Sequence, residues 1–101
     1  MRKRVYAVNG FRNLEKINME IHVTDESVQI YEYEKMRRKL YRETADPWCT
    51  IEHKRGRKKG FWKLRDTVDY WVNIDGDSLK CANKTVAEAI KRDIERRFGT
   101  R

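Results

Sequence analysis

Alternation of apolar and polar residues with a period of two runs through this sequence and limits the fold more than any other feature. From Glu15 to Val23, apolar side chains occupy every second position, and residues 28–31 repeat the pattern after a polar stretch at 24–27. The clearest alternation runs from Val68 to Ile74 and ends at Asp75-Gly76-Asp77, which is typical of a hairpin turn because glycine tolerates a positive φ. Half-buried antiparallel strands have this period. The sequence therefore predicts at least two β-hairpins.

Further strands are expected in the middle of the chain and after the Asp-Gly turn. Residues 79–81 continue the alternation and predict a short return strand. Residues 48–53 have strand character, and Phe61–Leu64 is expected to pair with them across a loop at Lys54–Gly60. Residues 33–43 fit two interpretations, a short helix or a strand, because their apolar residues suit either period.

The C-terminal segment changes its hydrophobic period from two to about four. Its apolar residues fall on one face of a helix and are Val86, Ile90, Ile94 and Phe98. Thr85, followed by Glu88 three residues later, is typical of a capping box, and Gly99 is typical of a helix end. We therefore expect an α+β fold. Its antiparallel sheet has about five or six strands, and a C-terminal amphipathic helix packs on one face.

Composition indicates one small and strongly basic domain. The 101 residues fit a single domain, in which residues 1–5 are expected to form a flexible basic arm. Lys and Arg number 24 against 16 Asp and Glu, which gives a net charge of +8. A high charge content is also found in disordered chains, but three Trp residues indicate a packed core. No membrane partner is expected, because a spanning helix needs roughly 20 consecutive apolar residues and no window approaches that.

The two cysteines, Cys49 and Cys81, are too few for a disulfide framework and favour a reducing, intracellular environment, the cytoplasm or a host cytoplasm. Both fall on the apolar side of expected strands, which predicts that they are buried. Cys49 and His53 have a spacing that resembles a metal-ligand pair. On a strand, however, positions four apart lie about 13 Å from each other, too far for one ion. We expect no metal and no cofactor.

The most basic segment of the chain is Lys54–Gly60, in which five of the seven residues are Lys or Arg. Its Arg-Gly-Arg core is similar to the AT-hook, a peptide whose two arginines enter narrow A·T minor grooves, although the flanking prolines of that motif are absent. The alternative is a solvated loop that keeps a small protein soluble. We expect phosphate contacts from the basic side chains in and beside this loop, namely Lys54, Arg55, Arg57, Lys58, Lys59 and Lys63. A second basic patch is expected around Arg37 and Arg38.

Aromatic residues on the polar sides of the expected strands form a second group of candidates. Trp71 lies between Asp69 and Asn73 on the polar side of its strand, and Trp62 follows the basic loop. Exposed aromatic side chains on a sheet stack with unpaired bases, with roughly 1–3 kcal/mol for each base. They are equally typical of protein–protein and homodimer interfaces. Trp62 and Trp71 are therefore expected to meet bases, with protein contact as the alternative.

Catalytic motifs are absent from the sequence. It contains no HExxH, GxSxG or Walker loop. The two histidines, His22 and His53, each fall on an expected strand. Glu52-His53-Lys54 supplies groups that a metal-free ribonuclease uses, but nothing in the spacing fixes a nucleophile beside a base. We therefore expect a protein that is not an enzyme, with ribonuclease activity as a minor alternative.

The C-terminal half, from Gly60 to Phe98, reads as strand, Asp-Gly turn, strand and then a helix that begins Thr-Val-Ala-Glu-Ala-Ile. This layout resembles the DNA-binding domains of phage-type integrase N-termini and of AP2-type plant factors, in which a three-stranded sheet packs on one helix. The resemblance implies only that such a layout can bind DNA. The segment at residues 15–34 has no counterpart in it, and Asp66 and Asp69 stand where a strand that reads a groove is expected to be basic.

Taken together, these features predict non-enzymatic binding of nucleic acid, with DNA favoured over RNA, through a basic hairpin loop assisted by aromatic side chains. The alternative is a protein-interaction module or inhibitor, in one version homodimeric, that docks on an acidic partner surface. Small size and high charge also suit an accessory protein of a virus or a mobile element.

Overall fold

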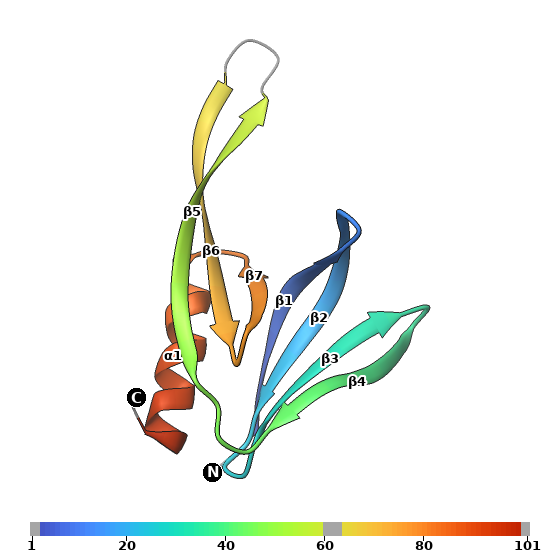
Figure 1. The fold of residues 1–101 in the computed structure, drawn as a ribbon, viewed down its shortest axis with the longest axis vertical. Helices are drawn as coiled ribbons and strands as arrows, with labels where there is room; N and C mark the ends of the chain where they lie inside the picture. Colours follow the sequence, from blue (N-terminus) through green and yellow to red (C-terminus); the bar gives the residue numbers. More distant parts are fainter. Residues whose placement is uncertain (1–2, 60–63, 100–101) are drawn as a thin grey trace.

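The computed structural model describes residues 3–59 and 64–99 and has an α+β architecture (Figure 1). Its elements are β1 (Arg4–Arg12), β2 (Glu15–Val23), β3 (Val28–Glu34), β4 (Arg37–Thr44), β5 (Cys49–Lys59), β6 (Leu64–Ile74), β7 (Asp77–Cys81) and α1 (Lys84–Phe98). The predicted class, the antiparallel sheet and the C-terminal helix are confirmed. The sheet has seven strands rather than five or six.

The sheet consists of two antiparallel meanders placed side by side, in the strand order β4-β3-β2-β1-β7-β6-β5. Strands β1 to β4 form one meander, and β5 to β7 form the other. Nine residue pairs join β1 to β2, whereas β1 meets β7 at the single pair Asn9 and Lys80. The second half of the chain therefore does not extend the first meander from its last strand but returns to its first strand.

Strand β1 includes two of the five residues that the sequence predicts as a flexible N-terminal arm. Arg4 pairs with Val23, so residues 4 and 5 belong to the sheet, while residues 1 and 2 lie outside the described residues. The alternation in β1 is weakened by Gly10, which sits on the buried side. A Cβ at that position would collide with the Sδ atom of Met19, so glycine leaves room there for the Met19 side chain.

Residues 33–43 do not form the short helix, whereas the strand interpretation is confirmed at residues 40–42, which belong to β4. The whole segment comprises the end of β3, a two-residue turn at Lys35-Met36 and most of β4. Both turn residues have positive φ, 50° and 65°, as a type I′ hairpin requires, and Glu34 pairs with Arg37 across the turn. Apolar residues spaced by three and four resemble a helical stripe here, but they lie on two strands that pair with each other.

Strands β5 and β6 are longer than the sequence predicts. Residues 54–59, expected as a loop, continue β5, and the partner of residues 49–53 is Tyr70–Ile74 rather than Phe61–Leu64. The predicted strand at Val68–Ile74, the Asp75-Gly76 turn and the return strand are confirmed, and the turn residues have φ of 48° and 93°.

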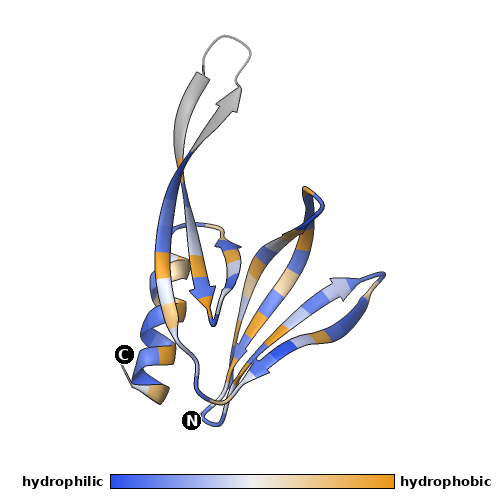
Figure 2. Cartoon of the chain, in the orientation of Figure 1, coloured by the Kyte–Doolittle hydropathy of each residue, from blue (hydrophilic) through white to orange (hydrophobic). Residues whose placement is uncertain are grey.

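Helix α1 packs on β5, β6 and β7 and buries the apolar stripe that the sequence predicts. Ala87, Ile90 and Ile94 are at most 1% exposed. Cys49 and Cys81 belong to the same core and are buried, as expected. The cap of the helix lies earlier in the chain than expected, because Asn83 rather than Thr85 accepts the bond from the backbone N–H of Val86, at 3.0 Å. Figure 2 shows the alternation of apolar and polar residues along the strands.

The base of the molecule is formed by three connections, residues 24–27, 43–48 and 75–77. They bond to one another: Ser27 Oγ donates to Glu43 at 2.9 Å, and Trp48 N donates to Asp75 Oδ1 at 2.8 Å. The base contains six carboxylates and no Lys or Arg. Figure 1 shows the connections at the ends of hairpins β1–β2 and β3–β4 pointing away from it. The fold thus separates an acidic base from the hairpin ends.

Candidate nucleic-acid interface

The outer half of hairpin β5–β6 is a two-stranded ribbon, which we call the arm. Of the described residues of β6, Tyr70–Ile74 pair with β7. Beyond that point, Lys54–Lys59 of β5 pairs only with Leu64–Asp69 of β6. Figure 1 shows the arm projecting well beyond the rest of the sheet. Because two strands are a narrow element, the arm can enter spaces that a whole sheet cannot.

The arm carries a large part of the positive charge of the protein. Residues 54–59 and 64–69 contain six Lys or Arg and two Asp, a net charge of +4. The predicted contact residues Lys54 and Arg55 lie at its root with exposed side chains, and Arg57, Lys58 and Lys59 follow along the backbone of β5. They therefore lie on a strand rather than in a hairpin loop. Trp62 and Lys63, also predicted as contacts, lie outside the described residues.

Trp71 lies at the root of the arm and is only partly exposed. Its ring is 5.6 Å from that of Phe11, and Lys54 Nζ lies 5.0 Å from the centre of the Trp71 ring. The sequence correctly places Trp71 on the face opposite the buried Val72 and Ile74, but its neighbours already cover part of the ring. The arrangement joins an aromatic pair on the sheet to the first cation of the arm.

Phe11 is a member of this cluster that the sequence analysis misses. It is 47% exposed, and it reaches Trp71 because β1 lies next to β7 and β7 next to β6. The run Val-Tyr-Ala-Val at positions 5–8 is rich in strand-forming residues and could have predicted the strand. The neighbour relation between β1 and β7 depends on the sheet order, which no local pattern contains.

Charges around the root are balanced rather than strongly basic. Lys54 Nζ lies 3.2 Å from Glu52, and Lys80 Nζ lies 3.7 Å from Asp69. Asn73 Nδ2 donates a hydrogen bond to Glu52 at 3.1 Å. This bond, together with Lys54, keeps the pKa of Glu52 below its ordinary value, so the carboxylate stays ionised near neutral pH. The excess of positive charge therefore lies further out along the arm.

The second predicted basic patch lies at the opposite edge of the sheet. Arg37 and Arg38 begin β4, the first strand in the sheet order, whereas the arm belongs to β5, the last. The guanidinium of Arg38 lies 5.1 Å from the ring centre of Tyr31, whose ring in turn lies 4.5 Å from that of His22. The structure does not bring the two basic patches together.

The two histidines and the two cysteines lie outside the arm. His22 is 1% exposed, and its Nε2 lies 2.9 Å from Glu20 Oε1, so a substrate cannot reach the ring. His53 is exposed and lies 6.2 Å from the ring of Tyr70. Burial raises the pKa of Cys49 to about 12 and that of Cys81 to about 11, which keeps both thiols protonated. Within residues 3–59 and 64–99, no group of three or more His, Cys, Asp or Glu residues could hold a metal ion.

Comparisons with known proteins add no assignment to this geometry. Family models, curated proteins and solved structures give no significant match to this chain. Among the described residues, no helix is long and apolar enough to cross a membrane. The functional argument therefore depends on the arm, the cluster at its root and the charge distribution.

Proposed function

We propose that this protein binds nucleic acid without catalysing a reaction on it, and that the arm is its main contact element. One observation carries the proposal: the described part of hairpin β5–β6 that extends beyond β7 is a two-stranded ribbon, and its residues 54–59 and 64–69 have a net charge of +4. A hairpin that served only to stabilise the fold would not need to extend beyond β7, the strand with which it pairs. Cations on such a ribbon can instead neutralise phosphates and release counterions.

The shape of the arm favours duplex DNA over duplex RNA. The major groove of B-form DNA admits a two-stranded β-ribbon, whereas the major groove of A-form RNA is too deep and narrow for side chains to read. Phosphate contacts position a protein but carry no sequence information, so sequence specificity is expected to be low. The reduced, buried cysteines fit an intracellular location for such a protein, which is part of the same proposal.

The root of the arm supplies a second type of contact. Phe11 is nearly half exposed beside Trp71. Lys54 lies at the edge of the same cluster, where its ammonium group can contact a phosphate. Stacking on such a platform is tolerant of sequence, since every base has an aromatic face. The proposal therefore includes base or groove contact at Phe11 and Trp71, next to phosphate contact along the arm.

Fluorescence anisotropy with labelled duplex DNA, single-stranded DNA and structured RNA, each at two salt concentrations, tests this function. The triple variant Arg57→Ala/Lys58→Ala/Lys59→Ala is expected to bind duplex DNA more weakly. Its dependence of log K on log salt should be shallower by about 0.9 for each phosphate that the variant no longer neutralises. The matched control is Lys84→Ala/Lys91→Ala/Arg92→Ala, which removes the same charge from helix α1 and should retain the slope of the wild type.

Two results would contradict the proposal. Equal losses of affinity in the two triple variants would show that net charge, rather than the arm, governs binding. Absence of binding to all three probes at low salt would contradict nucleic-acid binding as the function. The arm would then be assigned as a docking element for an acidic protein surface. Hydrolysis of the RNA probe that His53→Ala abolishes would instead establish the ribonuclease alternative.

A further inference from the structure

The end of hairpin β3–β4, residues Glu34–Lys39, is the second strongly basic element of the molecule. It contains four Lys or Arg and one Glu, and every residue in it is exposed. Arg38 lies over Tyr31. In the part of the chain that the structure describes, no ion pair engages Lys35, Arg37 or Lys39. Their charge is therefore free to attract an anion from solution.

This hairpin end and the arm lie at opposite edges of the sheet, with five strands between β4 and β5. At about 4.8 Å between neighbouring strands, the path across the sheet is roughly 29 Å. Figure 1 shows the two elements pointing in different directions from the base. A short stretch of phosphate backbone that follows one of them is directed away from the other.

The charges between these two elements are largely neutralised. Arg12 Nη2 lies 2.9 Å from Glu32 Oε2, and Lys80 Nζ lies 3.7 Å from Asp69 Oδ1. At the end of hairpin β1–β2, Lys16 is accompanied by Glu15. The two basic elements are thus separate regions of positive potential and do not form the two ends of one continuous basic stripe.

The tip of the same hairpin has an unusual side chain for a surface turn. Met36 is 99% exposed and has a φ of 65°, a conformation that costs a residue with a Cβ about 1–2 kcal/mol and that glycine adopts freely. The methionine side chain gains no packing in return. An apolar tip flanked by cations is the composition of elements that press between bases while their neighbours hold the phosphates.

We propose that the end of hairpin β3–β4 is a second, independent nucleic-acid contact site, and that one copy of the protein bridges two separate duplex segments. The inference rests on the proposed function of the arm, which holds the first segment. Lys35, Arg37 and Lys39 hold phosphates of the second segment, and Met36 contacts its bases or groove edge. Bridging of this kind needs no dimer, because both sites belong to one chain.

A capture experiment with two short duplexes tests the bridging. One duplex is immobilised, the protein is added and washed, and a second, labelled duplex is then supplied. Wild type is expected to retain the labelled duplex and to bind two short duplexes per monomer in solution. Lys35→Ala/Arg37→Ala/Lys39→Ala should bind one duplex through the arm, with capture of the second reduced to background. The charge-matched helix variant Lys84→Ala/Lys91→Ala/Arg92→Ala should capture it normally.

The outcomes separate this inference from the proposed function. Failure of wild type to bind any duplex overturns the proposed function itself. Binding of one duplex without capture of a second overturns only the bridging, as does equal capture by the hairpin variant. Sedimentation of the capturing species as a dimer would also overturn it, since two arms would then suffice. Binding of the hairpin end to phosphatidylserine vesicles, with DNA capture unchanged in the variant, would assign it to a membrane surface instead.

Discussion

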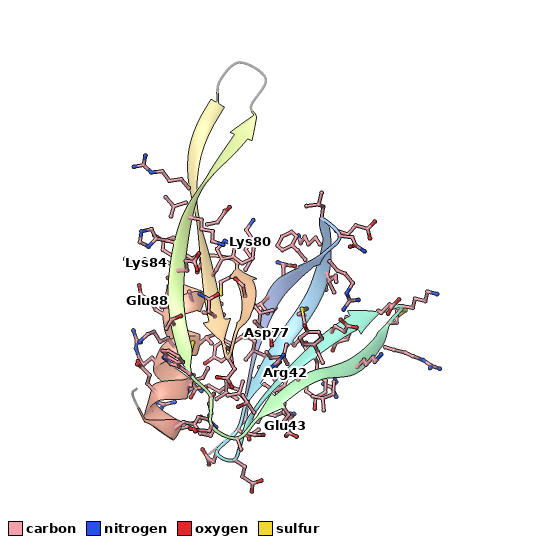
Figure 3. The ribbon with its side chains drawn as sticks, viewed as in Figure 1. Arg42, Glu43, Asp77, Lys80, Lys84 and Glu88 are labelled. Carbon is pink, nitrogen blue, oxygen red and sulfur yellow. The ribbon has the colours of Figure 1, made fainter. Side chains whose placement is uncertain are left out.

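Arg42 on β4 pairs with Asp77 at the start of β7, with Nε 2.5 Å from Oδ2, and the pair ties the first meander to the second. Figure 3 shows the two side chains meeting between the two halves of the sheet. Tyr41 Oη lies 3.5 Å from the other oxygen of Asp77 and adds a second contact to the same carboxylate. The pair thus links the two halves of the sheet through residues 35 positions apart in the chain.

Removal of this pair is expected to destabilise the fold modestly. Asp77→Asn keeps the shape of the side chain but removes its charge. Because Arg42 is 47% exposed, we expect the free energy of unfolding to fall by about 1 kcal/mol. Urea denaturation measures the change. As a control, Glu88→Gln disrupts the exposed pair with Lys84 on α1 and should alter the free energy by no more than about 0.5 kcal/mol. Equal effects of the two substitutions would contradict a special role for Asp77.

Two turn residues at the hairpin ends have side chains in a backbone conformation that favours glycine, so glycine is expected to stabilise the fold at both positions. Leu14 and Met36 have φ of 68° and 65° and are almost fully exposed. Leu14→Gly and Met36→Gly should each raise the free energy of unfolding by about 1 kcal/mol, because the backbone strain is relieved and neither side chain packs against a neighbour. Thermal and urea unfolding measure the gain.

The Asp75-Gly76 turn provides the opposite control for these substitutions. Gly76 has a φ of 93°, and Gly76→Ala should lower the free energy of unfolding by about 1 kcal/mol. Under the bridging proposal, Met36→Gly should also weaken capture of the second duplex while the fold becomes more stable. A residue with a purely structural role would not show this combination.

The position of the helix cap gives a sharp comparison between two neighbouring residues. Asn83 Oδ1 accepts the bond from Val86 N, so Asn83→Ala should lower the free energy of unfolding by about 1 kcal/mol. Thr85→Ala lies inside the helix and should change it by a few tenths of a kcal/mol at most. Urea denaturation measures both changes. A larger loss in Thr85→Ala than in Asn83→Ala would show that Thr85 is the cap.

Alkaline pH is expected to destabilise the protein through its two thiols. Their folded pKa values, about 12 for Cys49 and about 11 for Cys81, exceed the ordinary value of 9.0 because both side chains are buried. The unfolded chain therefore releases these protons at lower pH than the folded protein does, and stability declines as the pH rises above about 9. Below that pH, both states hold the protons and the contribution is fully present.

Unfolding midpoints between pH 8 and pH 11 test this linkage. The decline should be shallower in Cys49→Ala/Cys81→Ala than in the wild type, although the double variant starts from a lower stability because it leaves small cavities. Other titrating groups are common to both proteins and cancel in the comparison. Parallel curves would show that the thiols do not control the alkaline transition.

Sequence patterns predict much of this fold because most strands pair with a strand that is next to them in the chain. Alternation identified β2, the start of β3, the inner part of β6 and β7, and the spacing of Val86, Ile90 and Ile94 identified α1. The pattern fails where an element is polar on both sides. Strand β4 is exposed along almost its whole length, so no buried face leaves a period in its sequence.

The site is harder to predict than the fold because it depends on which strands are neighbours. The basic run at residues 54–59 is obvious from sequence, but its extension as a strand beyond β7 depends on how short β7 is. The contact between Phe11 and Trp71 joins residues 60 positions apart and follows from the pairing of β1 with β7. Likewise, only the strand order reveals that Arg37 lies at the edge opposite the arm.

The single backbone pairing between Asn9 and Lys80 has a mechanical consequence. A long ladder of hydrogen bonds resists bending along its length, whereas one pair contributes little to that resistance. The seam between the meanders is instead maintained by side chains. Val8 and Met19 from the first meander share one buried core with Val72 and Leu79 from the second, and Arg42 and Asp77 pair across the two halves. The stiffness of the sheet at this seam therefore depends on side-chain packing, so core substitutions there are expected to affect both halves together.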